Sequence, residues 1–133
     1  MTEYAITIVD DEETIRDGIL MSLEGSYRMA AYASAEKALA AMKRDLPDLV
    51  LLDIGLPGMT GLEALETIKN AYPEVLVIMI TAFEDVDTVI AAMKAGAHDY
   101  VVKPLHMEGL EVTIGNALDL SLIHISEPTR PRR

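Results

Sequence analysis

Short apolar runs alternate with amphipathic segments along the chain. The runs end in turn residues, which is typical of strands, and cover residues 4–9, 27–33, 49–52, 75–80 and 97–102. The segments between them repeat apolar residues every three or four positions, which predicts helices over about residues 13–24, 34–44, 60–70, 84–94 and 107–119. Such regular alternation with short connections requires parallel strands, right-handed crossovers and helices on both faces. The pattern therefore predicts a doubly wound α/β fold with a five-stranded parallel sheet and five helices.

The run at residues 49–52 is wholly apolar, which predicts a strand buried on both faces. The acidic residue Asp53 follows it directly, and a tight loop comes next, marked by Gly55, Pro57, Gly58 and Gly61. Open α/β folds bind ligands at the carboxyl ends of their strands. We therefore expect Asp53 to protrude from the rim of the sheet as a functional carboxylate. Taken alone, this stretch fits a loop aspartate that caps the following turn equally well.

Composition narrows the cellular setting and the partners. Half of the 133 residues are apolar, which is enough for one domain with a hydrophobic core. The sequence has no cysteine, which excludes disulfides and thiolate metal sites. No apolar run approaches the roughly 18 residues of a membrane span, and the first residues lack the features of a signal peptide. We expect a soluble cytoplasmic protein with no membrane contact. The formal charge of −11 argues against direct nucleic-acid binding and favours metal cations or basic partners.

Chemically active side chains stand where the predicted strands end. They are Asp10 and Asp11, Asp53, Thr81, and Lys103. Glu12 and Glu13 fit an ordinary solvated helix start, because acidic side chains are favourable at the positive end of the helix dipole. This explanation suits Asp10 and Asp11 less well, because they lie at the end of the strand rather than inside the helix. Close carboxylates raise one another's pKa values, and a hard divalent cation such as Mg²⁺ removes that conflict. With Lys103 and the Thr81 hydroxyl, the cluster forms a pocket for a doubly charged oxyanion beside a carboxylate nucleophile.

These residues and their spacing resemble the receiver domain of bacterial two-component response regulators. The resemblance covers residues 4 to about 119 and is carried by Ile8-Val9-Asp10-Asp11-Glu12, Asp53-x-x-x-Pro57-Gly58 with Gly61, Thr81-Ala82 and Lys103-Pro104. It implies a flavodoxin-like sheet of strand order 2-1-3-4-5.

The resemblance also implies roles for individual residues. Asp53 would be the phosphate acceptor, and Lys103 would contact the phosphoryl group. Mg²⁺ would be bound by Asp10, Asp11, Asp53 and the backbone carbonyl of Gly55. The family commonly has a larger side chain at the position of Gly55, and glycine leaves the pocket more open to water.

Two further residues would communicate phosphorylation to the surface. Thr81 corresponds to the switch hydroxyl, and Tyr100 corresponds to an aromatic side chain that changes rotamer on activation, although a half-buried strand tyrosine is an ordinary structural feature. In the family the Lys103–Pro104 peptide bond is cis. The surface expected to change comprises the helix at residues 85–94 and the last strand.

The implied function is signalling rather than enzymatic turnover. A sensor histidine kinase would phosphorylate Asp53 and shift an existing equilibrium between inactive and active surfaces, with homodimerisation on activation. Residues 81–97 resemble transcriptional activators of the nitrogen-regulation type, in which a receiver controls a sigma-54 ATPase and a DNA-binding domain. Transcription would then be controlled through an output domain absent from this chain. A stand-alone single-domain regulator and a receiver attached to another output are the alternatives.

Two other functional classes are disfavoured by particular residues. A magnesium-dependent phosphohydrolase with an aspartyl intermediate commonly has a second acid two residues after its nucleophile, where this chain has Gly55. A flavin-binding electron carrier would need a phosphate loop rich in hydroxyls and glycines after the first strand. This chain has four acids there.

The pattern breaks after Asp119. We expect the receiver domain to comprise residues 1–119 and residues 120–133 to be a tail outside it, in which Ser121–Arg133 makes few contacts with the domain. A linker to an output domain and a native basic tail are two interpretations. A third is that Leu120–Arg130 resembles one frame of a translated transposon-end sequencing adapter, in which case the tail is an artefact that replaces native sequence.

Overall fold

The computed structural model describes residues 3–82 and 86–126, with side chains described through Asp119. The strands are β1 (Ala5–Val9), β2 (Arg28–Tyr32), β3 (Leu49–Asp53), β4 (Leu76–Thr81) and β5 (Asp99–Val102). The helices are α1 (Glu13–Leu23), α2 (Ala35–Met42), α3 (Gly61–Ala71), α4 (Val86–Lys94) and α5 (Met107–Ser126). All strand pairs are parallel and their order is β2-β1-β3-β4-β5, which confirms the predicted fold.

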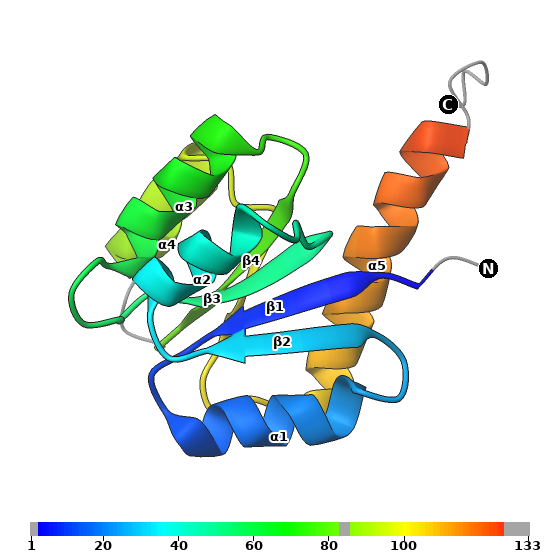
Figure 1. Ribbon diagram of the computed structural model, residues 1–133, viewed down its shortest axis with the longest axis horizontal. Coiled ribbons are helices and arrows are strands. Elements are labelled where there is room, and N and C mark those ends of the chain that lie inside the picture. The colour runs from blue at the N-terminus through cyan, green and yellow to red at the C-terminus, as the bar shows by residue number, and fades with distance from the viewer. Residues whose placement is uncertain (1–2, 83–85, 127–133) are drawn as a thin grey trace.

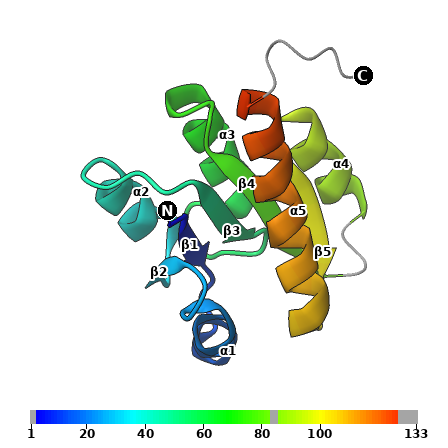
Figure 2. The ribbon, with the colours of Figure 1, turned by 90° about the vertical axis from the view of Figure 1, so that its right-hand side faces the viewer.

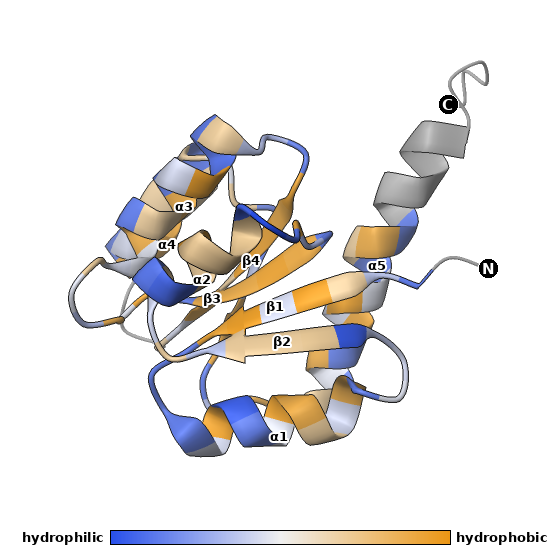
Figure 3. Ribbon diagram, in the orientation of Figure 1, coloured by the Kyte–Doolittle hydropathy of each residue, from blue (hydrophilic) through white to orange (hydrophobic). Residues whose placement is uncertain are grey.

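The sheet separates two hydrophobic cores (Figures 1 and 2). Helices α2, α3 and α4 pack on one face, and α1 and α5 pack on the other. Side chains alternate along each strand, so Val50 and Leu52 enter the first core while Leu49 and Leu51 enter the second. Because both faces are covered, the apolar residues of β3 are fully buried, which explains why its sequence lacks polar alternation (Figure 3).

Strand register brings the functional end of the sheet together. Val9 pairs with Leu52, so Asp10 and Asp53 follow at the same level on adjacent strands. Thr81 pairs with Val102, which places Lys103 one residue beyond. The four strand ends therefore share one edge, as the sequence predicted.

The helix starts agree with their local sequence signals where the structure describes them. Ser34 accepts a hydrogen bond from the Lys37 N–H, and Thr60 and Glu63 form the predicted capping box. The predicted start of α4 at residues 84–85 lies outside the described residues. None of the helices within residues 3–82 and 86–126 is long and apolar enough to cross a membrane.

The last helix is longer than the sequence pattern indicated. α5 continues to Ser126, whereas the expected domain ends at Asp119. The domain boundary at residue 119 stays a prediction, as does the expectation that Ser121–Arg133 makes few contacts, because the side chains beyond Asp119 lie outside the described part.

Replacing Gly61 by alanine should destabilise the domain. A Cβ at Gly61 would overlap the carbonyl oxygen of Asp53 and the Cα of Ile54, both backbone atoms that cannot rotate away. We expect a loss of about 1–3 kcal/mol in the free energy of unfolding, measured by urea denaturation. The control is Gly18→Ala within α1, where a Cβ meets nothing within 4 Å. It should gain about 0.5–1 kcal/mol from helix propensity. Unchanged stability of Gly61→Ala would show that α3 can move away from β3.

Candidate functional site

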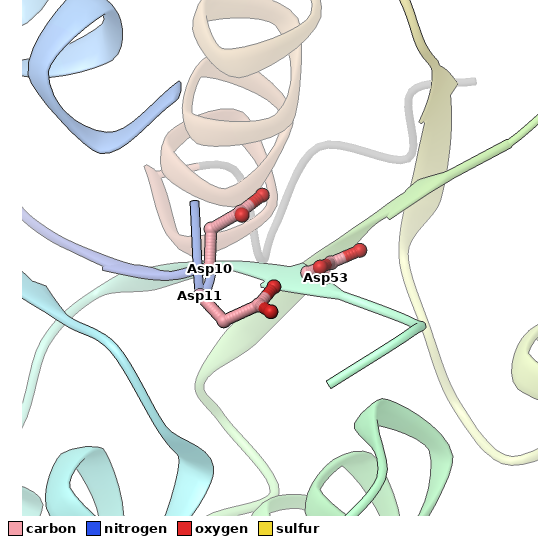
Figure 4. A group of neighbouring side chains, drawn as sticks. All are labelled: Asp10, Asp11 and Asp53. Carbon is pink, nitrogen blue, oxygen red and sulfur yellow. The ribbon is translucent and has the colours of Figure 1, made fainter. Parts of the chain in front are cut away.

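Three carboxylates gather at the carboxyl edge of the sheet. Asp10, Asp11 and Asp53 each offer an oxygen atom, and these atoms all lie within 4.8 Å of one another. Figure 4 shows Asp10 and Asp11 projecting from the end of β1 and Asp53 from the end of β3. The sequence predicted this cluster at the edge of the sheet, but the expectation that Asp53 protrudes from that edge was wrong. Only 5% of Asp53 is exposed, because it is the last residue of a strand covered on both faces.

Asp10 is the most buried member of the cluster. It has no exposed surface, and its Oδ1 accepts a hydrogen bond from the Glu12 N–H at 2.9 Å. Its Oδ2 is buried and accepts no hydrogen bond from any described residue. A buried carboxylate oxygen without a donor is costly unless a cation lies beside it.

Lys103 provides the positive charge nearest the cluster. Its Nζ lies 3.6 Å from Asp10 Oδ2, 3.6 Å from Asp53 Oδ1 and 3.9 Å from Glu12 Oε1. The Lys103 N–H donates to the Thr81 carbonyl at 2.8 Å, and the Lys103–Pro104 peptide bond is cis, as the resemblance implied. The contact with Glu12 was not foreseen, because the sequence pattern explains Glu12 as an ordinary helix start.

Burial and mutual repulsion set the protonation of the site. Burial raises the pKa of Asp10, against the opposing effects of the Glu12 N–H and the Lys103 charge. Burial also raises the pKa of Asp53, and the nearby Asp10 carboxylate raises it further. Burial alone would lower the pKa of Lys103, but the carboxylates of Asp53, Asp10 and Glu12 outweigh it and raise that pKa. Ionising both buried aspartates therefore costs folding free energy that one ammonium does not fully offset.

These residues fit a hard divalent cation. Magnesium prefers a few carboxylates plus water, and the cluster offers three carboxylates, one with a buried oxygen that no described donor satisfies. The Gly55 N–H donates to Asp53 Oδ1 at 3.3 Å, so the loop that follows β3 folds back toward the Asp53 carboxylate. A Cβ at Gly55 would meet no atom within 4 Å, which leaves this side of the pocket open. The role of the Gly55 carbonyl as a ligand stays a prediction.

Thr81 and Tyr100 lie near the edge but outside the acidic cluster. Thr81 is buried, and its hydroxyl donates to the Ala82 carbonyl at 3.1 Å rather than to a carboxylate. Tyr100 is 43% exposed on β5. Both residues line an apolar groove of about 600 Å³ against α4, together with Val86, Ile90 and Met93 among others. The structure thus places the two expected switch residues at a second, apolar site beside the first.

Replacing Asp10 by asparagine should stabilise the metal-free protein at pH 7. Because the pKa of Asp10 is raised in the folded protein, protonation of Asp10 stabilises the fold at low pH. That contribution to the free energy of unfolding is lost as the pH rises from below the usual aspartate pKa through the raised pKa. Asparagine keeps the oxygen that accepts from Glu12 and removes the buried charge, so we expect a higher free energy of unfolding in urea denaturation with EDTA. Magnesium should then stabilise the parent protein more than the variant.

The matched control is Asp45→Asn, which removes the same charge from an exposed carboxylate paired with Arg28 at 3.1 Å. Its stability should stay within about 0.5 kcal/mol of the parent, with or without magnesium. A metal-free Asp10→Asn protein that is less stable than the parent would contradict the electrostatic account.

Comparisons with known proteins agree with this geometry. Residues 6–114 match the family described as the response regulator receiver domain. The chain is 38% identical over 114 residues to the transcriptional regulatory protein ZraR of Klebsiella oxytoca, covering 85% of this chain and 26% of that protein. It is 39% identical over 119 residues to the nitrogen assimilation regulatory protein NtrX of Azorhizobium caulinodans, covering 87% and 26%. The predicted likeness to regulators of the nitrogen type is thereby confirmed.

Solved structures give the same result. The crystal structure of the receiver domain of NtrX from Brucella abortus superposes with a TM-score of 0.82 at 36% identity, covering 86% of this chain and 98% of that one. This chain spans about a quarter of the length of the two curated relatives named above. Together, the family match, the sheet order and the strand-end residues show that the chain belongs to the response regulator receiver domain family.

Proposed function

We propose that this domain accepts a phosphoryl group on Asp53 from the phosphohistidine of a cytoplasmic sensor kinase and passes the signal to the face formed by α4 and β5. The observation that carries the proposal is the position of Asp53. Its Oδ1 lies 3.6 Å from the Lys103 ammonium, inside a cluster of carboxylates suited to magnesium.

The chemistry follows from the groups present. A carboxylate oxygen of Asp53 attacks phosphorus, an O–P bond forms, and the P–N bond to the donor imidazole breaks with its electron pair going to nitrogen. The product is an acyl phosphate. Lys103 holds positive charge beside the attacking carboxylate, since its Nζ lies 3.6 Å from both Asp53 Oδ1 and Asp10 Oδ2. Asp10, Asp11, Asp53 and the Gly55 carbonyl would hold Mg²⁺, which when bound neutralises charge on the transferring phosphoryl oxygens.

A donor must reach a carboxylate that is almost buried. A groove of about 510 Å³ lies beside the cluster, between α1 and the segment that follows β5. Ile15 and Gly18 line it from α1, and Leu105 and Met107 line it from the opposite wall. Lys103 also lines the groove and pairs with Asp53 at 3.6 Å, so a kinase segment seated there would lie beside the site.

The output surface is the apolar groove beside Thr81. Val86, Ile90 and Met93 of α4 are 59%, 49% and 40% exposed, which is unusual for large apolar side chains on one short helix. A phosphoryl group adds roughly −1.5 to −2 charges and three acceptor oxygens, which would draw the Thr81 hydroxyl away from Ala82. We infer that this movement alters the groove and promotes homodimerisation. Control of transcription would then pass through an output domain outside this chain.

Phosphorylation should occur on Asp53 alone. With magnesium and acetyl phosphate, intact-mass spectrometry should show one added phosphoryl group that is labile to base, and omitting magnesium should slow its addition. Asp53→Asn should abolish it and keep the fold, because asparagine has nearly the same shape. Asp45→Asn, which changes an exposed carboxylate, should label normally. Labelling that persists in Asp53→Asn would assign the acceptor elsewhere.

Phosphorylation should also change the face formed by α4 and β5. Amide exchange in peptides from residues 82–103 should differ between the free and phosphorylated protein, and sedimentation should show increased self-association. Ile90→Glu should prevent the association without affecting labelling, because it places a charge in the apolar groove. The matched control is Met21→Glu on α1, which changes another exposed apolar residue. Unchanged exchange after confirmed phosphorylation would contradict this output surface.

A further inference from the structure

Arg16 makes an unexpected contact for a cation surrounded by acids. It lies in the first half of α1, close in sequence to Asp10, Asp11, Glu12 and Glu13. Among the described residues it forms no ion pair within 4 Å. Its Nη1 instead donates to the backbone carbonyl oxygen of Asp10 at 2.8 Å, in a partly buried position.

This contact clamps the turn between β1 and α1. The backbone N–H of Arg16 donates to the Glu12 carbonyl at 3.1 Å, in the first turn of the helix. Its side chain reaches back to the Asp10 carbonyl, just beyond the last residue of β1. The same residue thus holds both ends of the short segment that carries Asp10 and Asp11.

Asp10 is consequently fixed at three points. Its N–H donates to the Tyr32 carbonyl at 3.1 Å, its carbonyl accepts from Arg16, and its Oδ1 accepts from the Glu12 N–H. The one polar atom of Asp10 without a hydrogen bond from a described residue is Oδ2, which lies 3.6 Å from Lys103 Nζ in the acidic cluster. Three anchors set both the position and the rotation of this carboxylate.

We propose that Arg16 is a positioning residue, which aims Asp10 Oδ2 and the neighbouring Asp11 carboxylate at a shared divalent cation by clamping the Asp10 carbonyl. This role rests on the proposed function of the cluster as a magnesium site. Groups behind metal ligands that hold them in place commonly affect metal affinity by about 10- to 100-fold.

The sign of the effect separates positioning from simple electrostatics. If Arg16 acted only through its charge, removing it would leave the acidic cluster more negative and tighten magnesium binding. If Arg16 acts through the clamp, removing it weakens binding despite that gain in attraction. The two accounts therefore predict opposite changes in one measurement.

The test titrates MgCl₂ into the parent chain, Arg16→Met and Arg16→Lys, followed by calorimetry and backbone amide shifts. Methionine keeps the apolar stem of the arginine and removes its donor. Lysine keeps a charged donor, and only one guanidinium nitrogen is used here. We expect Arg16→Met to weaken magnesium binding about tenfold and Arg16→Lys to recover most of that loss. Arg28→Ala is the control, because it removes the same charge from an exposed pair with Asp45 far from the cluster.

A second readout needs no metal. With EDTA present, the Glu12 amide should exchange faster with solvent in Arg16→Met than in the parent, because its acceptor on Asp10 is no longer held. An unchanged Glu12 amide, or unchanged or tighter magnesium binding in Arg16→Met, would overturn the proposal. A parent protein that binds no magnesium would contradict the proposed function instead, and the Glu12 amide would still decide whether the clamp exists.

Discussion

The repulsion among Asp10, Asp11 and Asp53 is the constraint on which the rest of this structure depends. Three carboxylate oxygens share a space under 5 Å across, and one ammonium within 4 Å compensates two of these groups. Left in water, such groups would separate at little cost. Here the ends of β1 and β3 hold them together, because the strands between the two cores cannot shift without exposing fully buried leucines and isoleucines. The stability of the cores thus maintains an electrostatically unfavourable site, which a cation can relieve.

The surrounding loops add precision to what the sheet imposes. Gly61 lets α3 begin against the backbone of Asp53, closer than any side chain would permit. On the neighbouring strand, hydrogen bonds from Glu12 and to Tyr32 fix Asp10, while the peptide N–H of Lys103 is tied to β4. Asp10 and Lys103 are therefore both held by backbone groups of neighbouring segments. This arrangement suits the proposed phosphoryl transfer, in which Asp53 would meet a donor with little reorganisation of the site.

Most of the fold and the membership of the site were predictable, whereas side-chain directions were not. The alternation of apolar strand segments with amphipathic helices predicts the parallel sheet. In a parallel sheet the carboxyl ends of the strands lie at one edge, which brings Asp10, Asp53 and Lys103 together. By contrast, the Thr81 hydroxyl bonds to Ala82, which depends on one rotamer that no periodicity encodes. The burial of Asp53 was underestimated, because the last residue of a strand covered on both faces can still be buried. Arg16 was missed because its partner is a backbone carbonyl, which leaves no complementary residue type in the sequence.

In the proposed switch, Thr81 would connect the phosphorylation site to the apolar groove that it lines, but its hydroxyl alone cannot account for a complete switch. Exchanging a neutral hydrogen bond for one to a charged phosphoryl oxygen gains about 1–2 kcal/mol. Shifting the ratio of active to inactive conformations from 1:99 to 99:1 requires about 5.5 kcal/mol. The remainder must come from contacts that differ between the two states on the groove side, where Val86, Ile90 and Met93 are exposed. Covering that surface with a second copy would supply such contacts, since each Å² of apolar surface removed from water contributes roughly 25 cal/mol. On this reasoning, the proposed self-association would complete the switch that phosphorylation of Asp53 would begin.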